Sequence, residues 1–581
     1  MSTPGSAPAR RGWLLWVPAG VLLVLLGLAL VVHPFTSVDW LVILIGLGLL
    51  VGGVVEAIAA ILLRSETRPS RLASAGLGAI GIVLGVLVFA WPGVTAGLLV
   101  VLLAILLAAA GVRDLVLAFR RDQPQRWTEV LFGLAGVIAA ITIIAWPDVT
   151  VMAIGLLFGL WLIAAGLRLA LGALVRRFRR RGPAPGRRHP ILRGVLSVLA
   201  FAAAIVIAFV GVRLSSTAIP DAFYTPPADV PAEPGTLLAA EPFAREVPDG
   251  AHAWRILYTT TGLDDAPAVA SALVVVPDAD GPHPVIGWTH GTTGVATGCA
   301  PSLLAEPFTA GAMPDLDAAI AEGWAVVATD YVGLGTAGTH EYVVGEPAGR
   351  AELDALRAAR QLDGADLADE TVLWGHSQGG HAALWTAGLA DAYAPELDIL
   401  GVAAMAPAAN LPALLSSFAD DSMSLLFGAF VLTGYSAAYP DVRIADYVKP
   451  SARIVVDEIA RRCFVDPATL VSVLQIGFSG GPVWTQDPES GPLADRADEN
   501  VPRLPIAFPV LLAQGLADPL ITPVAQDAYV QERCASGQAL DYRTYPGRDH
   551  MGVVTGDSPL LPELMAWTAA RFAGLAATST C

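Results

Sequence analysis

The two halves of this chain differ in how hydrophobic and polar positions alternate. In the first 213 residues, seven apolar runs reach about 18 residues or more, the length that a helix needs to cross a membrane. They lie near residues 13–33, 39–63, 72–91, 95–119, 127–146, 150–174 and 191–212. This half is therefore expected to form an all-α transmembrane bundle. The first run resembles a signal peptide, but no small-residue cleavage site follows it, so we expect it to be retained.

From about residue 251 onward, short apolar runs alternate with helical stretches such as Gly349–Leu362. The runs expected to form strands are Ala268–Val276, Pro284–Trp288, Trp324–Thr329, Thr371–Trp374 and Ile399–Ala404. This alternation is typical of a mainly parallel sheet with helices on both faces. Residues 214–250 hold seven prolines and are expected to form a semi-rigid linker whose later part packs on the C-terminal domain. We therefore expect domains at 1–213 and 251–581, joined by 214–250.

Composition and charge separate the same two halves. The chain is 54% hydrophobic with a mean hydropathy of +0.59, which is too apolar for a soluble enzyme of 581 residues. Residues 1–213 contain 19 arginines and seven acidic residues, a net charge of +12, whereas the remainder has a net charge of −29. The acidic C-terminal half argues against a nucleic-acid partner.

The arginines of the first half predict its orientation in the membrane. Basic residues precede the first run and occupy the loops after the second, fourth and sixth runs, whereas the turns at 34–38, 92–94 and 147–149 contain none. Since short cytoplasmic loops carry the positive charge, we expect a cytoplasmic N-terminus and an extracytoplasmic segment after about residue 213. The seven arginines of residues 176–188 are also suited to contact anionic membrane lipids, although topology alone explains them equally well.

The segment Gly375-His376-Ser377-Gln378-Gly379 stands between a strand-like run and a helical stretch. A G-x-S-x-G pattern in this context is typical of a strained turn that exposes a serine nucleophile. The two glycines have no Cβ to clash where the chain reverses. Ser377 is therefore the candidate nucleophile, and the alternative is a glycine-rich turn that contains serine by chance.

A serine hydroxyl requires a base and an orienting carboxylate, and in this architecture the carboxylate and then the base follow it along the chain. Asp518 lies just beyond the strand-like run Phe508–Gly515 and is the expected acid. His550 follows the strand-like run Ala539–Tyr545 and is the expected base.

Two other aspartates compete with Asp518. Asp541 falls inside a predicted strand, and Asp549 is adjacent to His550 and poorly placed to hold its ring. We therefore favour Asp518.

The 141 residues between Ser377 and Asp518 exceed what one strand–helix–strand unit requires. We assign about residues 408–500 to an inserted, mostly helical cap. Its apolar run Leu425–Leu432 is expected either to line an acyl pocket or to form the core of the cap.

Ester or amide cleavage also requires donors to the oxyanion. These are expected from the amide after the nucleophile, Gln378, and from a loop after an earlier strand. The segment Trp288–Gly294 supplies that loop, with the amide of Gly291 or Thr292 as the donor; the alternative is an ordinary glycine turn. These residues imply no metal and no organic cofactor.

Together, these motifs resemble the secretory lipase family of α/β-hydrolases. Asp518 and His550 match the acid and base positions of that family. The resemblance implies an α/β-hydrolase fold and cleavage of carboxylic esters, with acylglycerols as the typical substrates. It extends over roughly residues 220–581, and its segments are Asp221–Pro227, His290–Thr292, Asp330–Thr336 and Gly375–Gly380.

The membrane half repeats internally. His33-Pro34, Trp91-Pro92 and Trp146-Pro147 each end one apolar run and open the next, at intervals of 58 and 55 residues. Three helical hairpins are therefore expected before a seventh helix. This half resembles the short-repeat membrane proteins of the acid-resistance type, whose repeat carries Trp-Pro-Gly or a near variant at such a turn. His33 departs from that pattern, and the resemblance implies little about mechanism.

All four cysteines lie in the half predicted to be outside, where disulfides persist. Cys299, Cys463, Cys534 and Cys581 allow three pairings. We expect Cys299 to pair with Cys463, which would link a loop near the oxyanion strand to the cap. Free buried thiols are the alternative.

The expected function is extracytoplasmic hydrolysis of carboxylic esters by Ser377, Asp518 and His550 through an acyl-enzyme. The expected partners are an ester or lipid substrate and membrane lipids, and no oligomeric state is predicted. The alternatives are a serine exopeptidase or acyltransferase on the same fold, and a membrane sensor or transporter whose outer domain binds lipid without turnover. The complete set of three residues argues against the sensor.

Overall fold

The computed structural model describes residues 13–32, scattered positions between 47 and 88, and residues 92–119, 126–176, 190–214, 217–417, 422–450, 452–477 and 483–581. The chain divides into two compact units. Apart from two short segments after residue 447, the first unit ends at Leu214.

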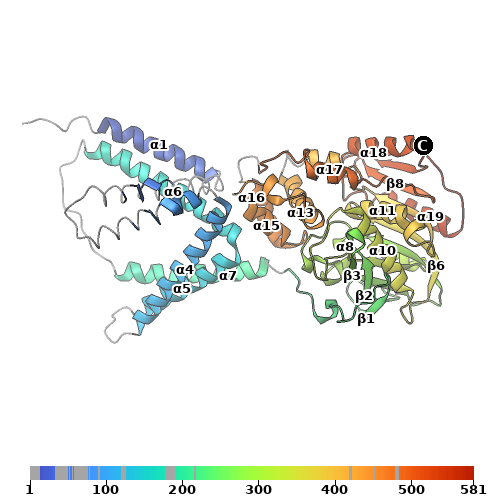
Figure 1. The fold of residues 1–581 in the computed structure, drawn as a ribbon. Helices are drawn as coiled ribbons and strands as arrows, with labels where there is room; N and C mark the ends of the chain where they lie inside the picture. Colours follow the sequence, from blue (N-terminus) through green and yellow to red (C-terminus); the bar gives the residue numbers. More distant parts are fainter. Residues whose placement is uncertain are drawn as a thin grey trace, which may run out of the picture. The chain divides into compact units, whose positions relative to one another are not determined.

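The first unit is built from long apolar helices (Figure 1). Among the described residues these are α1 (Trp13–Val32), α4 (Pro92–Ala118), α5 (Arg126–Ala145), α6 (Pro147–Arg176) and α7 (Pro190–Leu214). Four stretches are long and apolar enough to span a membrane, namely Val100–Ala118, Arg126–Ala145, Pro147–Arg168 and Arg193–Arg213. Most of the predicted runs 39–63 and 72–91 lies outside the described residues, as do most of the arginines that predict the orientation.

Glycines let the helices of this unit approach one another closely. A Cβ on Gly20 of α1 would lie 2.7 Å from the carbonyl oxygen of Gly166 in α6. A Cβ on Gly111 of α4 would lie equally close, at 2.7 Å, to the carbonyl oxygen of Gly133 in α5. Backbone contact of this kind gives the van der Waals packing that holds helices together in lipid. Trp146 is the one residue between α5 and α6, and Pro147 begins α6.

The second unit is organised around a nine-stranded sheet with the order β1-β2-β3-β5-β4-β6-β7-β8-β9. The first three pairings in this order are antiparallel and the other five are parallel. The strands are β1 (Leu237–Phe243), β2 (Ala251–Thr261), β3 (Pro267–Pro277), β4 (His283–Thr289), β5 (Ala325–Thr329), β6 (Leu367–His376), β7 (Asp398–Met405), β8 (Val510–Gly515) and β9 (Asp541–Tyr545). The predicted strands correspond to β3 to β9, whereas β1 and β2 had no prediction.

Helices cover both faces of the sheet (Figure 1). One buried cluster contains side chains of α10 (Gly345–Ala359), α11 (Gln378–Tyr393) and α18 (Pro523–Ala535). The other contains side chains of α9 (Leu316–Ala321) and α19 (Leu560–Phe572). This arrangement confirms the predicted fold class. It places the carboxyl ends of the parallel strands together at one edge, where open α/β sheets hold their ligands.

The segment between β7 and β8, which we call the cap, is helical among its described residues. It contains α12 (Leu411–Ser417), α13 (Ser422–Ala438), α14 (Ile444–Tyr447), α15 (Arg453–Ala460), α16 (Pro467–Gly477) and α17 (Pro492–Glu499). Short helices elsewhere in the second unit are α8 (Pro307–Ala310), η1 (Ala222–Tyr224), η2 (Leu263–Asp265), η3 (Thr297–Cys299) and η4 (Pro301–Leu303).

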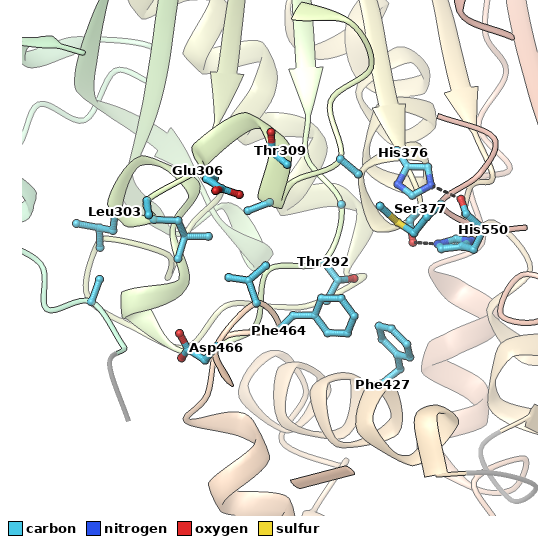
Figure 2. Close-up of a pocket in the computed structure, with 18 of the residues that line it drawn as sticks. Thr292, Leu303, Glu306, Thr309, His376, Ser377, Phe427, Phe464, Asp466 and His550 are labelled. Carbon is cyan, nitrogen blue, oxygen red and sulfur yellow. Dashed lines mark hydrogen bonds between the residues drawn. The ribbon is translucent and has the colours of Figure 1, made fainter. Parts of the chain in front are cut away.

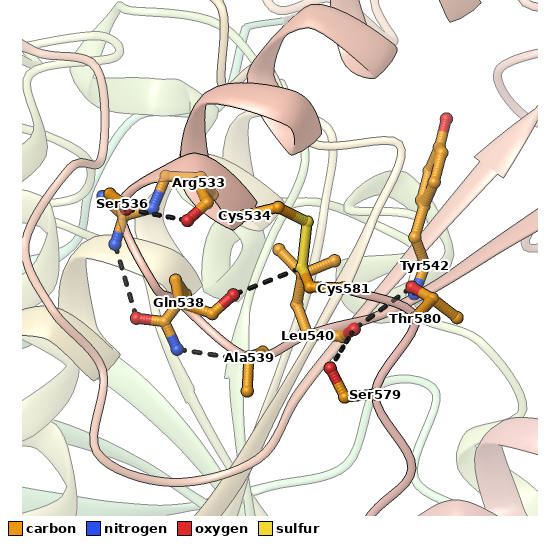
Figure 3. Close-up of a disulfide and its surroundings, with 10 residues drawn as sticks. All are labelled: Arg533, Cys534, Ser536, Gln538, Ala539, Leu540, Tyr542, Ser579, Thr580 and Cys581. Carbon is orange, nitrogen blue, oxygen red and sulfur yellow. Dashed lines mark hydrogen bonds between the residues drawn. A yellow bond between two sulfur atoms is a disulfide. The ribbon is translucent and has the colours of Figure 1, made fainter.

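Two disulfides cross-link the second unit. Cys299 pairs with Cys463 across 164 residues, which confirms the expected link between the loop after β4 and the cap. Cys534, the penultimate residue of α18, pairs with Cys581 (Figure 3). Beside this second disulfide, the amide of Thr580 donates to the carbonyl oxygen of Leu540 at 2.8 Å, so the C-terminal segment lies along the start of β9.

Candidate active site

Ser377 occupies the sharp turn between β6 and α11. Its φ of 57° and ψ of −118° are strained for a residue with a side chain. The turn is possible because a Cβ on Gly375 would lie 2.1 Å from the carbonyl oxygen of Gly379, and a Cβ on Gly379 would lie 1.9 Å from that of Thr289. Any residue other than glycine at these two positions would therefore collide with the backbone.

The structure brings Ser377, His550 and Asp518 into one hydrogen-bonded chain (Figure 2 shows the first two). The Ser377 hydroxyl lies 2.8 Å from Nε2 of His550, and Nδ1 of His550 lies 2.8 Å from Oδ2 of Asp518. A carboxylate only accepts, so Nδ1 carries the proton and Nε2 faces Ser377 as an acceptor. Asp518 follows β8 and His550 follows β9, so two neighbouring parallel strands position them.

The Asp518 carboxylate is held on both oxygens. Its Oδ1 accepts from the backbone amides of Leu520 and Ile521 at 2.8 and 2.9 Å, while Oδ2 accepts from His550 and from Nε2 of Gln514. The side chain is fully buried. These contacts determine which oxygen faces the imidazole.

The competing aspartates point elsewhere. Asp541 pairs with Arg543 at 2.8 Å and accepts from the hydroxyl of Thr578 at 3.0 Å. Asp549 accepts from the amide of Gly552 at 2.6 Å. Among the described residues, neither carboxylate has a hydrogen bond with His550.

The two alternatives for the loop donor to the oxyanion differ in whether the amide already has an acceptor in the protein. The amide of Gly291 donates to the carbonyl oxygen of Gly311 at 2.8 Å, so its proton is already used within the protein. Within the described part of the chain, the amide of Thr292 has no such acceptor. The amide of Gln378 lies in the first turn of α11, where helix amides have no partner in the helix.

Four buried histidines surround this site and are neutral near pH 7. Burial lowers the pKa of His290 and His381 to about 4 and the pKa of His340 and His376 to about 3. Nε2 of His376 donates to the carbonyl oxygen of His550 at 3.0 Å (Figure 2). That bond fixes the backbone of the loop that carries His550.

Two residues near the nucleophile had no prediction from the sequence. Nδ1 of His340 donates to the carbonyl oxygen of Val332 at 3.1 Å, and Nε2 then accepts from the side-chain amide of Gln378 at 2.7 Å. The hydroxyl of Tyr342 lies 2.6 Å from that of Thr292. The only local signal was a histidine and a tyrosine close together in a loop between β5 and α10.

A cavity of about 760 Å³ opens at Ser377. It extends past Thr292 and Phe464 toward Leu303, Glu306 and Asp466 (Figure 2). Most of its wall is apolar. Phe427 is the one member of the predicted run Leu425–Leu432 that lines it, whereas Leu426, Phe430 and Leu432 are buried in the cap. The run therefore contains one residue that lines the cavity and several that form the core of the cap.

Two family models match this sequence. The model of secretory lipases matches residues 312–580, and a model described as a short repeat of unknown function matches residues 19–82, 76–145 and 131–209. Both predicted resemblances are confirmed, as are the three copies of the membrane repeat.

Individual relatives share the second unit. A protein named probable inactive lipase from Mycobacterium tuberculosis is 28% identical over 378 residues, which cover 61% of this chain and 82% of the relative. Lipase A of Moesziomyces aphidis is 26% identical over 402 residues, which cover 62% of this chain and 83% of the relative. The crystal structure of Candida antarctica lipase A is similar with a TM-score of 0.54 and 22% identity, over 62% of this chain and 87% of that one. The second unit thus has a lipase-type α/β-hydrolase fold, and its relatives support ester hydrolysis.

Proposed function

We propose that this chain, whose C-terminal part matches the secretory lipase model, is a membrane-anchored serine hydrolase that cleaves carboxylic esters outside the membrane. The observation that carries the proposal is the hydrogen-bonded chain of Ser377, His550 and Asp518 at an apolar cavity of about 760 Å³. A nucleophile, a base and an orienting carboxylate in this order are what acyl transfer requires.

In the proposed reaction, His550 takes the hydroxyl proton of Ser377 as Oγ attacks the ester carbonyl, whose π electrons move to its oxygen. The amides of Gln378 and Thr292 donate to this oxyanion, and Asp518 stabilises the imidazolium. Collapse of the intermediate breaks the bond to the alkoxy oxygen, which takes the proton from His550 and leaves as an alcohol. Water, deprotonated by His550, then attacks the acyl-enzyme carbonyl. The second tetrahedral intermediate breaks its bond to Oγ of Ser377, which takes the proton back from His550, and the carboxylic acid leaves.

The cavity supports an ester with a substantial apolar part. Phe427, Phe464 and Leu304 contribute hydrophobic surface to the cavity, and cavities of several hundred Å³ are typical of small-molecule sites. A lipid or another apolar ester is the substrate class that this lining favours.

The proposed location rests on the apolar helices, the basic loops and the cysteines. Four stretches can span a membrane by length and composition, and the arginine pattern predicts an outer C-terminal unit. Two disulfides in that unit are typical of proteins outside the cytosol.

Turnover has to be measured, since one relative bears the name of a probable inactive lipase. We expect the full-length protein in detergent to hydrolyse p-nitrophenyl esters and the Ser377→Ala variant to lose at least about 10⁴-fold in kcat. Ser490→Ala, which changes an exposed cap serine that hydrogen-bonds locally to Asp487, is the matched control. Equal rates for wild type and Ser377→Ala would refute the proposal. Faster cleavage of p-nitroanilides than of the esters would instead favour a peptidase.

A further inference from the structure

Thr292 and Tyr342 form a pair of hydroxyl groups beside the nucleophile. Both residues are buried, and their side-chain oxygens are 2.6 Å apart. Thr292 lines the large cavity, whereas Tyr342 lines a smaller one next to it. Because Ser377, Phe427 and His550 border both cavities, the hydroxyl pair lies where the two cavities meet at the nucleophile.

The loop that carries Thr292 is attached to the turn that carries Ser377. Thr289, the last residue of β4, donates its hydroxyl to the carbonyl oxygens of Trp374 and Gly379 at 3.0 and 2.7 Å. The backbone of Gly379 also packs directly on Thr289, which is why a Cβ there would collide. The segment after β4 is therefore held in place relative to the nucleophile.

The available acceptors decide the direction of the hydrogen bond within the pair. Within the described residues, Thr292 is the one hydrogen-bond partner of the Tyr342 hydroxyl. Burial raises the pKa of Tyr342, so this phenol keeps its proton and needs an acceptor. A buried donor without an acceptor is costly, so Tyr342 donates to Oγ1 of Thr292. The proton of the Thr292 hydroxyl is then not used in the pair and is free to point into the cavity.

We propose that the Thr292 hydroxyl is a third donor to the oxyanion, beside the two backbone amides, and that Tyr342 is the positioning residue that orients it. This inference rests on the proposed ester hydrolysis. A hydroxyl that accepts a hydrogen bond becomes a stronger donor, since bonds in such a chain polarise one another. A hydrogen-bond donor whose bond strengthens only when negative charge develops on the carbonyl oxygen raises kcat and leaves KM nearly unchanged.

Three substitutions in the full-length protein test this role. Thr292→Val keeps the shape and the backbone amide but removes the hydroxyl, and we expect kcat to fall about 10²-fold at nearly constant KM. Thr292→Ser keeps the hydroxyl and is expected to recover most of that loss. Tyr342→Phe is expected to lower kcat by a smaller factor. In a Thr292→Val background, Tyr342→Phe should cause no further loss, because Tyr342 acts through Thr292.

A trifluoromethyl ketone provides a second readout. It forms a hemiketal with the nucleophile whose oxygen mimics the oxyanion, so its inhibition constant should rise in Thr292→Val by the same factor as kcat/KM falls. Wild-type kcat in Thr292→Val, or a loss that appears only in KM, would overturn the inference.

Loss of ester hydrolysis on Ser377→Ala is independent of Thr292, so the inference can fail while the proposed function stands. A wild-type protein without esterase activity would remove both. The melting temperature shows whether Thr292→Val folds. If it does not, the test is kcat of Tyr342→Phe, measured alone and in a Thr292→Ser background. Unchanged kcat in Tyr342→Phe would then overturn the inference.

Discussion

Replacing Asp518 by asparagine changes one atom in the proposed catalytic chain and should reverse the role of the imidazole. In the native structure, Oδ1 of Asp518 accepts from the amides of Leu520 and Ile521, and Oδ2 accepts from Nδ1 of His550 at 2.8 Å. The two amides require an oxygen, so the NH₂ group of asparagine must face the histidine. Nδ1 of His550 must then accept, which moves the ring proton to Nε2 and blocks Nε2 as a base for Ser377.

The expected fall in kcat follows because the variant loses the base for Ser377 but keeps the rest of the site. A wrong tautomer in a serine triad lowers kcat by about 10⁴-fold, and KM should change little because the cavity walls are intact. Nε2 of Gln514, which lies 3.2 Å from Oδ2, would also face the new NH₂ group, so a loss of about 1–3 kcal/mol in the free energy of unfolding is expected for a buried unpaired donor.

The assay is p-nitrophenyl ester hydrolysis by full-length protein, with kcat and KM measured separately and folding followed by the melting temperature. Asp549→Asn and Asp541→Asn are the matched controls, since these carboxylates competed with Asp518 and neither contacts His550 among the described residues. Both controls should keep kcat within about threefold of wild type, because the exposed Asp549 bonds to Gly552 and the buried Asp541 bonds to Arg543 and Thr578 rather than to the catalytic chain. An Asp518→Asn protein that retains kcat, or an Asp549→Asn protein that loses it, would refute the assignment of the carboxylate.

Three further predictions concern stability and topology. The four buried histidines stay neutral in the folded state down to about pH 3–4, whereas the unfolded chain protonates them below about pH 6.5. Their contribution to stability is therefore lost as pH falls from about 6.5. His381→Gln should reduce the slope of unfolding free energy against pH by about 1.4 kcal/mol per pH unit between pH 4.5 and 6. Urea titrations that give equal slopes for wild type and variant would contradict this. Cys299→Ser opens a link across 164 residues and should cost about 2–5 kcal/mol in unfolding free energy. It should also raise KM, since Phe464 adjoins Cys463 and lines the cavity, whereas Cys534→Ser should leave KM unchanged. An alkaline phosphatase fused to the C-terminus should be active, because the second unit is expected on the outer side of the membrane. An inactive phosphatase fusion, together with fluorescence of a cytosolic reporter fused to the C-terminus, would contradict the topology.

Much of the fold was accessible from local patterns. The strands β3 to β8 carry short apolar runs, β9 lies in the strand-like run Ala539–Tyr545, and the prolines at 92 and 147 begin helices. The strands β1 and β2 had no prediction. β1 has Glu241 and Pro242 near its C-terminal end and lies at the edge of the sheet, where a strand needs no continuous apolar run.

Part of the candidate site was predictable, because the order of strands and residues along the chain limits which side chains the fold can bring together. Asp518 was separated from Asp541 and Asp549 by its place after a strand, and the structure places Asp518 against His550. The choice between Gly291 and Thr292 was not predictable, because it depends on the carbonyl oxygen of Gly311, twenty residues further along the chain. Tyr342 was missed for the same reason, since its bond to Thr292 spans 50 residues.

Local patterns along the chain specify the apolar spans, the repeat and the glycine-flanked turn at Ser377, because hydrophobic periodicity and turn sterics act between residues a few positions apart. Packing of distant segments sets which carboxylate meets His550, which amide already has an acceptor, and which hydroxyls pair beside the nucleophile. A hydrogen bond requires heavy atoms within about 3 Å and a suitable angle, and packing of β4, β6, β8 and β9 into one sheet sets those distances.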